Sequence, residues 1–112
     1  MTIMTKVMKK SEWEVGKAKG EITEASLKQE GFIHCSFLEQ SLKVAETHFS
    51  NESELVLLII DPALVEAEIK YELASNGQKY PHIYGALHTA AVVNVVPFYK
   101  ENGNFMLPKV VL

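Results

Sequence analysis

Arginine is absent from this chain of 112 residues, and all eleven of its basic residues are lysines. The chain therefore has no planar guanidinium that could bind a phosphate or carboxylate through two parallel hydrogen bonds. Any bound anion has to be held by lysine, hydroxyl, histidine or backbone N–H groups. The net charge is −3. Because no basic stripe is present to follow a phosphate backbone, we expect no binding to duplex nucleic acid.

Cysteine and long apolar runs are also scarce. Cys35 is the only cysteine, so no disulfide can form within the chain. The longest wholly apolar run, Leu55 to Ile60, is far shorter than the roughly 18 residues of a membrane span. Met1 to Lys10 lacks the apolar segment of a signal peptide. These absences predict a cytoplasmic protein that does not bind a membrane.

The composition is that of an ordinary globular domain. Apolar residues make up 47% of the chain and charged residues 22%, which argues against a disordered tail or a fibrous repeat. No internal repeat or linker-like segment divides the sequence. We therefore expect a single domain over residues 1–112.

The first third of the sequence predicts a strand and two short helices. Thr5 to Lys9 is a candidate strand. The spacing Ser11-Glu12-Trp13-Glu14 is typical of a capping box, in which Glu14 bonds back to the amide of Ser11. Gly20 is expected to end this first helix, and Gly31 a second, because glycine readily adopts the left-handed conformation.

The next segment predicts a strand that runs directly into a helix. Phe32 to Ser36 is typical of a buried strand, in which His34 and Ser36 share one face and Cys35 lies on the other. Ser36 is then expected to cap a helix over about Phe37 to Phe49, with Glu39 as the second member of the capping box.

The second half predicts strands. Leu55 to Ile60 is apolar on both faces, which indicates a central strand covered on both sides. Glu68 to Glu72 alternates, with Ile69 and Tyr71 expected to face inward. Further strands are expected near Val92 to Pro97 and Phe105 to Leu107. The pattern predicts an α+β fold with five to seven strands in a mostly antiparallel sheet and two or three short helices.

His34 is the first candidate functional residue, because strand parity places it with Ser36 at one end of an apolar strand. A histidine of this kind can bind a ligand, but it can also be a structural histidine that a backbone carbonyl satisfies.

The segment Tyr80-Pro81-His82-Ile83-Tyr84-Gly85 is the second candidate. Pro81 fixes the entry of the chain and Gly85 permits close approach, so His82 and Tyr84 could form the wall of a cleft. The alternative is a pair of buried tyrosine rings beside a histidine in a surface loop.

Three other residues carry weaker signals. Glu72 could act as a base or bind a ribose hydroxyl, or it could belong to a solvated strand face. Cys35 is expected to be a buried, unreactive thiol, and Trp13 a core residue rather than a ligand-stacking one. No short spacing of metal ligands occurs, so no metal site is expected.

The sequence resembles the uncharacterised bacterial and plant family catalogued as domain of unknown function 952. The resemblance rests on motifs spread in order over nearly the whole chain: Trp13, Gly31 to Ser36, Glu39-Gln40, Leu55 to Asp61, Glu72, Pro81 to Gly85 and Phe105 to Pro108.

This family is grouped with the ADP-ribosyltransferase-like fold, a small split, mostly antiparallel sheet that binds a nicotinamide dinucleotide. The resemblance implies that His34 orients a ribose and that Glu72 assists transfer from it. From the residues themselves we expect His34 and His82 to belong to one cleft, with Ser36 and Tyr84 as further contacts to the ligand. NAD is then the expected substrate. Two departures stand out: Tyr84 follows Glu72 instead of preceding it, and Lys70 lies where family members often have arginine.

Two functional hypotheses result. In the first, the protein is an enzyme that processes NAD or an ADP-ribosylated group. In the second, it is a non-catalytic module that binds a nucleotide, another small metabolite or a protein partner with the same residues.

Overall fold

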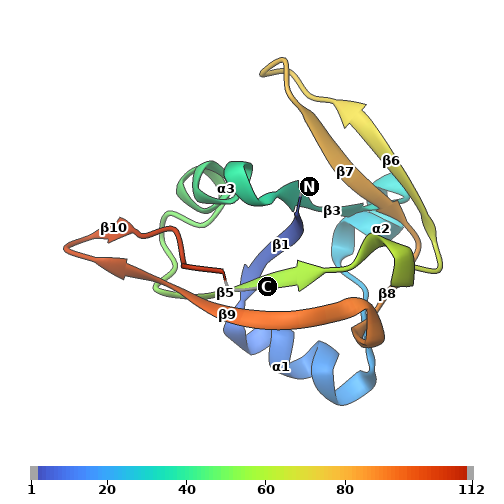
Figure 1. Ribbon diagram of the computed structural model, residues 1–112, viewed down its shortest axis with the longest axis horizontal. Coiled ribbons are helices and arrows are strands. Elements are labelled where there is room, and N and C mark those ends of the chain that lie inside the picture. Colours follow the sequence, from blue (N-terminus) through green and yellow to red (C-terminus); the bar gives the residue numbers. More distant parts are fainter. Residues whose placement is uncertain (1–2, 111–112) are drawn as a thin grey trace.

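The computed structural model describes residues 3–110. Within this range the chain forms an α+β fold in which every strand pairing is antiparallel (Figure 1). The helices are α1 (Lys10–Lys19), α2 (Ala25–Glu30) and α3 (Ser41–His48), with short 3₁₀ helices η1 (Leu38–Gln40), η2 (Pro62–Leu64) and η3 (Thr89–Ala91). The strands are β1 (Met4–Lys9), β2 (Glu21–Ile22), β3 (Ile33–His34), β4 (Ser36–Phe37), β5 (Glu54–Ile60), β6 (Glu68–Leu73), β7 (Lys79–Tyr84), β8 (Leu87–His88), β9 (Val92–Glu101) and β10 (Asn104–Phe105).

The strands are divided among three sheets. A five-stranded sheet has the order β10-β9-β5-β1-β4, a three-stranded sheet has the order β3-β7-β6, and β2 pairs with β8. In Figure 1 the β6–β7 hairpin extends away from the long strands β5 and β9. The number of strands exceeds the expected five to seven because five of them are only two residues long.

Strand β5 is the centre of the five-stranded sheet, as the unbroken apolar run predicts. Residues 55, 57 and 59 join a core cluster that includes Ala45 of α3. Residues 56, 58 and 60 join a second cluster, on the opposite face, that includes Trp13 of α1 and Ile83 of the three-stranded sheet. The core role expected for Trp13 is thereby confirmed. Helix α3 and the three-stranded sheet thus lie on opposite sides of β5.

Glycine ends two of the helices as expected. Gly20 and Gly31 have φ angles of 84° and 90°, in the left-handed region. The Gly31 N–H donates to the carbonyls of Ser26 and Leu27, at 3.1 and 3.0 Å. Each glycine therefore reverses the chain directly after a short helix. None of the helices in residues 3–110 is long and apolar enough to cross a membrane.

The two predicted capping boxes are wrong. Helix α1 begins at Lys10, directly after β1, so Ser11 lies inside the first turn and Lys9 stands at the N-cap without a side-chain hydrogen bond. Ser36 belongs to β4, and its hydroxyl lies 3.0 Å from that of Thr5. The 3₁₀ helix η1 that follows has Phe37 at its N-cap instead, and the Phe37 N–H donates to Oε1 of Gln40, the third residue of η1, at 2.9 Å.

The predicted strand Phe32 to Ser36 is split between two sheets. β3 pairs with β7, whereas β4 pairs with β1 of the five-stranded sheet. The chain crosses from one sheet to the other at Cys35. Parity is lost at this crossing, so the expectation that His34 and Ser36 share a face is wrong: His34 is exposed and Ser36 is buried.

Strand β6 confirms one of its two expected inward residues. Ile69 packs against the core, but Tyr71 is exposed. Its ring stacks on Phe37 instead, with centroids 5.9 Å apart. Tyr71 lies on an edge strand of the three-stranded sheet, and its partner Pro81 on the central strand β7 is fully buried, so the same face is covered at β7 but not at β6. The last two strands also differ in extent from those expected: β9 is longer, and β10 is shorter and starts one residue earlier.

The two-sided burial of β5 predicts a large effect of shortening its side chains. Leu57 is fully buried, so Leu57→Ala should lower the free energy of unfolding by about 2–5 kcal/mol through loss of apolar burial and creation of a cavity. Leu73→Ala is the matched control, because Leu73 also lies in a strand but is 70% exposed, and it should change stability by less than about 0.5 kcal/mol. Urea unfolding measures both values; equal effects would contradict the assignment of β5.

Candidate functional site

Most of the candidate residues lie on one face of the three-stranded sheet. The opposite face, with Ile33 and Ile83, packs against the core. We call the outward face the histidine face; its residues are Phe32, His34, Lys70, Glu72, His82 and Tyr84. Cross-strand register places His34 on β3 and Lys70 on β6 both opposite His82 of β7. The sheet therefore aligns side chains from three strands that are far apart in sequence.

His34 and His82 are neighbours across β3 and β7. The Cys35 N–H donates to the Pro81 carbonyl at 3.0 Å, so the hydrogen bonds of this ladder flank the two histidines and leave them as a non-hydrogen-bonded pair. Side chains of such a pair approach more closely than those of a hydrogen-bonded pair. The imidazole centroids are 5.3 Å apart, with the ring planes at 76°.

Glu72 is the acceptor that two other residues of the face share. Its Oε1 accepts hydrogen bonds from Nδ1 of His82, at 2.9 Å, and from the Tyr84 hydroxyl. These hydrogen bonds, from Tyr84 and His82, hold the pKa of Glu72 below its ordinary value. The same bond to Glu72, together with burial and the charges of Glu72 and Glu68, raises the pKa of Tyr84 to about 12. Tyr84 is therefore a stable hydrogen-bond donor at neutral pH.

The carboxylates select which nitrogen of each imidazole carries a proton. His82 donates through Nδ1 to Glu72, which leaves Nε2 as the acceptor in the neutral ring. His34 donates through Nε2 to Oε2 of Glu30, at 2.9 Å, which leaves Nδ1 as the acceptor. In the neutral form of each ring, one nitrogen is therefore left to accept a hydrogen bond from a hydroxyl group.

Phe32 and Lys70 complete the face, although the sequence does not predict either as a site residue. The Phe32 ring stacks on His82 with centroids 4.1 Å apart and also contacts the rings of His34 and Tyr84, at 4.9 and 5.2 Å. The Lys70 ammonium lies 4.6 Å from the centroid of Tyr84. The signal for Phe32 is strand parity, which puts it on the side of His34.

The structure contradicts the expected place of Ser36 and confirms that of Gly85. Ser36 does not lie on the histidine face, because it is buried and bonded to Thr5. The close approach expected at Gly85 is confirmed: a methyl group there would lie 2.8 Å from Cβ of Ala67. The 80–85 segment is mostly strand β7 rather than a loop.

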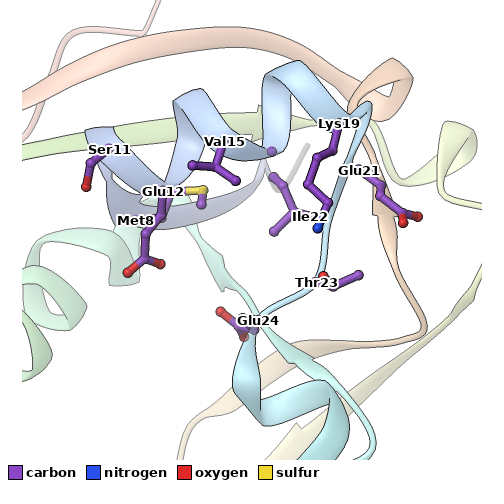
Figure 2. A pocket seen from close by; sticks show the side chains of 10 residues that line it. Met8, Ser11, Glu12, Val15, Lys19, Glu21, Ile22, Thr23 and Glu24 are labelled. Carbon is purple, nitrogen blue, oxygen red and sulfur yellow. The ribbon is translucent and has the colours of Figure 1, made fainter.

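The histidine face is open. The side chain of His34 is 52% exposed and that of Glu72 is 40% exposed. A pocket of about 220 Å³ lies elsewhere, between α1 and residues 21–24 (Figure 2), and another of about 390 Å³ is lined by residues of β9 and the segment after β10. In the part of the chain that the structure describes, no three histidine, cysteine, aspartate or glutamate side chains are arranged to hold a metal ion.

Cys35 lies behind the face, in the core. Its side chain is buried, as expected, and points away from His34. Burial raises the pKa of the thiol to about 12; the nearby Lys6 charge opposes this rise and that of Glu24 adds to it. At neutral pH the sulfur is therefore protonated, which disfavours a role as nucleophile.

Comparison with known proteins gives a family and a related structure. A family model described as "Protein of unknown function (DUF952)" matches residues 7–95. The chain is similar to the crystal structure of protein CC0527 from Caulobacter crescentus, with 29% sequence identity, a TM-score of 0.85 and 95% of each chain covered. A crystal structure of a double mutant of CC0527 gives a TM-score of 0.84.

The solution NMR structure of CC0527 is also similar. It is 30% identical, with a TM-score of 0.78, and the match covers 94% of this chain and 91% of that one. No curated protein matches the chain.

The hydrogen bond between Tyr84 and Glu72 predicts a specific response to mutation. Glu72→Gln removes the carboxylate charge, so the pKa of Tyr84 should fall from about 12 toward its ordinary value of 10.0. Because the pKa of Tyr84 is raised on folding, the stability that the bond contributes is present below about pH 10 and is lost as the pH rises through 12. NMR titration of the tyrosine rings measures the shift.

Glu68→Gln is the control for this titration. Glu68 lies opposite Tyr84 in the sheet but acts on it through charge alone, so its removal should lower the pKa of Tyr84 less than Glu72→Gln does. An equal fall in both variants would mean that general charge, rather than the Glu72 hydrogen bond, sets the value.

The burial of Cys35 predicts slow chemistry at its thiol. A thiol reagent at neutral pH should label the native protein far more slowly than the urea-unfolded protein, because the native thiol is inaccessible and its pKa is about 12. The absorbance of the released chromophore follows both reactions. Equal rates in the two states would show that Cys35 is accessible in the native fold.

Proposed function

The chain belongs to the family of proteins of unknown function DUF952, and from the geometry of the histidine face we propose that it is an NAD- or ADP-ribose-processing enzyme of the ADP-ribosyltransferase type. The observation that carries this proposal is the convergence of His34, His82, Tyr84 and Glu72 on one face of the three-stranded sheet. NAD, or an ADP-ribosylated group, is the proposed substrate.

The proposal includes an ADP-ribosyltransferase-like fold. In such a fold a split, mostly antiparallel sheet binds the nicotinamide dinucleotide. The division of the strands here between a five-stranded and a three-stranded antiparallel sheet supports this assignment.

Glu72 is the proposed catalytic carboxylate. When the bond between ribose C1′ and the nicotinamide nitrogen breaks, its electron pair leaves with nicotinamide and positive charge develops on the ribose. A carboxylate held close to C1′ stabilises that charge. The two donors that bond to Glu72, His82 and Tyr84, both reach its Oε1, so Oε2 is the oxygen proposed to face the ribose.

The two histidines have complementary proposed roles. His34, through its free Nδ1, accepts a hydrogen bond from a ribose hydroxyl and so orients the sugar. His82, through its free Nε2, accepts the proton of the incoming nucleophile; with water as nucleophile, NAD yields nicotinamide, ADP-ribose and one proton. The Phe32 and Tyr84 rings offer stacking surfaces for the nicotinamide. In the absence of arginine, Lys70 is the cation proposed to approach the pyrophosphate.

The openness of the face favours a second candidate function. Because His34 and Glu72 are substantially exposed, water is poorly excluded, whereas enzymes usually enclose the reacting atoms. A non-catalytic module would use the same side chains to bind a nucleotide, another small metabolite or a protein partner.

One set of measurements separates the two functions. Wild-type protein should release nicotinamide from NAD and bind NAD by calorimetry. Glu72→Gln should lower the rate of release by about 10²-fold or more, the usual size of a lost catalytic carboxylate, while retaining most of the binding. His34→Ala and His82→Ala should weaken binding. His88→Ala is the matched control, because His88 is an exposed histidine on β8 that pairs with Glu66.

The outcomes decide between the proposals. Binding of NAD without release of nicotinamide would establish the module and overturn the enzyme. Absence of both would overturn NAD as the ligand. Loss of activity in His88→Ala equal to that in Glu72→Gln would contradict the assignment of the histidine face as the site.

A further inference from the structure

Lys6 is a charged side chain inside the core. It lies on β1 between Met4 and Met8, and strand alternation places all three on the face of the five-stranded sheet that turns toward the three-stranded sheet. The lysine side chain is only 4% exposed. An ammonium group at such a position is stable only where partners replace its water.

Those partners are Glu24 and the backbone of His34. Nζ of Lys6 donates to Oε2 of Glu24 at 2.7 Å and to the His34 carbonyl at 2.8 Å. The other carboxylate oxygen, Oε1, accepts the His34 N–H at 2.8 Å and the Ser26 hydroxyl at 2.7 Å. The ion pair therefore binds both backbone polar groups of His34 at once.

The N–H and carbonyl of His34 make no hydrogen bond to the neighbouring strand β7. β3 is an edge strand of the three-stranded sheet, and the non-hydrogen-bonded pairing with His82 turns the His34 N–H and carbonyl away from β7. A further strand would normally bond to them. Here one buried ion pair takes the place of that strand at a single residue.

Glu24 is ionised in this arrangement. Burial alone raises the pKa of its carboxyl, but the charge of Lys6 and the hydrogen bonds from Lys6, Ser26 and the His34 N–H outweigh burial and lower it below its ordinary value. Figure 2 shows Glu24 at one end of the pocket between α1 and residues 21–24. Its side chain is 26% exposed, so solvent reaches this end of the ion pair.

We propose that Lys6 and Glu24 are positioning residues of the histidine face: they hold the backbone of His34 so that its imidazole lies against Phe32 and His82. The inference rests on the proposed function for its catalytic meaning. Its structural content, the fixed contact between two imidazoles, is independent of any ligand.

The test replaces both charges together. Removing only Glu24 would leave the buried lysine unpaired, whereas paired apolar replacement of a buried ion pair is often tolerated. Lys6→Met/Glu24→Met removes the ion pair and both bonds to His34. In the folded variant we expect loss of the nuclear Overhauser effect between the His34 and His82 rings, and NAD binding reduced to that of His34→Ala.

Two further variants make the result specific. Lys6→Met/Glu24→Gln restores an acceptor for the His34 N–H and should recover part of the ring contact. Lys9→Met/Glu52→Met is the matched control, because Lys9 and Glu52 form a surface ion pair at 3.8 Å, and it should leave the contact unchanged.

A folded double-methionine variant that keeps the wild-type contact between the rings would overturn the positioning role. If that variant does not fold, the same nuclear Overhauser effect is measured in Lys6→Met. In Lys6→Met the His34 carbonyl loses its donor, while Glu24 can be hydrated from the pocket. Wild-type protein that neither binds NAD nor releases nicotinamide would overturn only the proposed function, since the ring contact is measured without ligand.

Discussion

The burial of one lysine charge joins the two larger sheets of this protein. Lys6 belongs to the five-stranded sheet, and the groups that compensate its charge are a carboxylate before α2 and a carbonyl of β3 in the three-stranded sheet. Removing one member of a buried ion pair typically costs about 3–5 kcal/mol because the other charge is left unpaired. This contact therefore stabilises the placement of the two sheets, and of the histidine face on the smaller one, together with the apolar cluster that packs Ile33 and Ile83 against β5.

Much of the fold is predictable because its signals are local. A run that is apolar on both faces predicts the central strand β5, and glycines predict the ends of α1 and α2, since each depends on neighbouring residues alone. The split of Phe32 to Ser36 was not predictable, because it arises from pairing with two different strands, β7 and β1. The capping boxes at Ser11 and Ser36 also depend on neighbouring elements. Ser11 lies inside the first turn because α1 begins directly after β1, and Ser36 belongs to β4, which pairs with β1.

The candidate site was predictable in its residue types but not in its geometry. Parity and composition identify His34, Glu72, His82 and Tyr84. Only the sheet register, however, shows that His34 lies directly opposite His82. Glu30 lies four residues before His34 but is brought to it by a turn at Gly31. Lys6 did carry a signal in the sequence, a lysine at core parity between Met4 and Met8, which predicts a buried and therefore paired charge.

Phe32 contacts three of the rings that make up the histidine face. Substitutions at positions that share a contact do not have additive effects. A change at any one of these four rings therefore alters the effect that a substitution at the other three has on stability. In evolutionary terms, the face can exchange a peripheral cation such as Lys70 in a single step, whereas its aromatic centre has to change as a group. Drift in this protein should therefore begin at the rim of the face and reach Phe32 last.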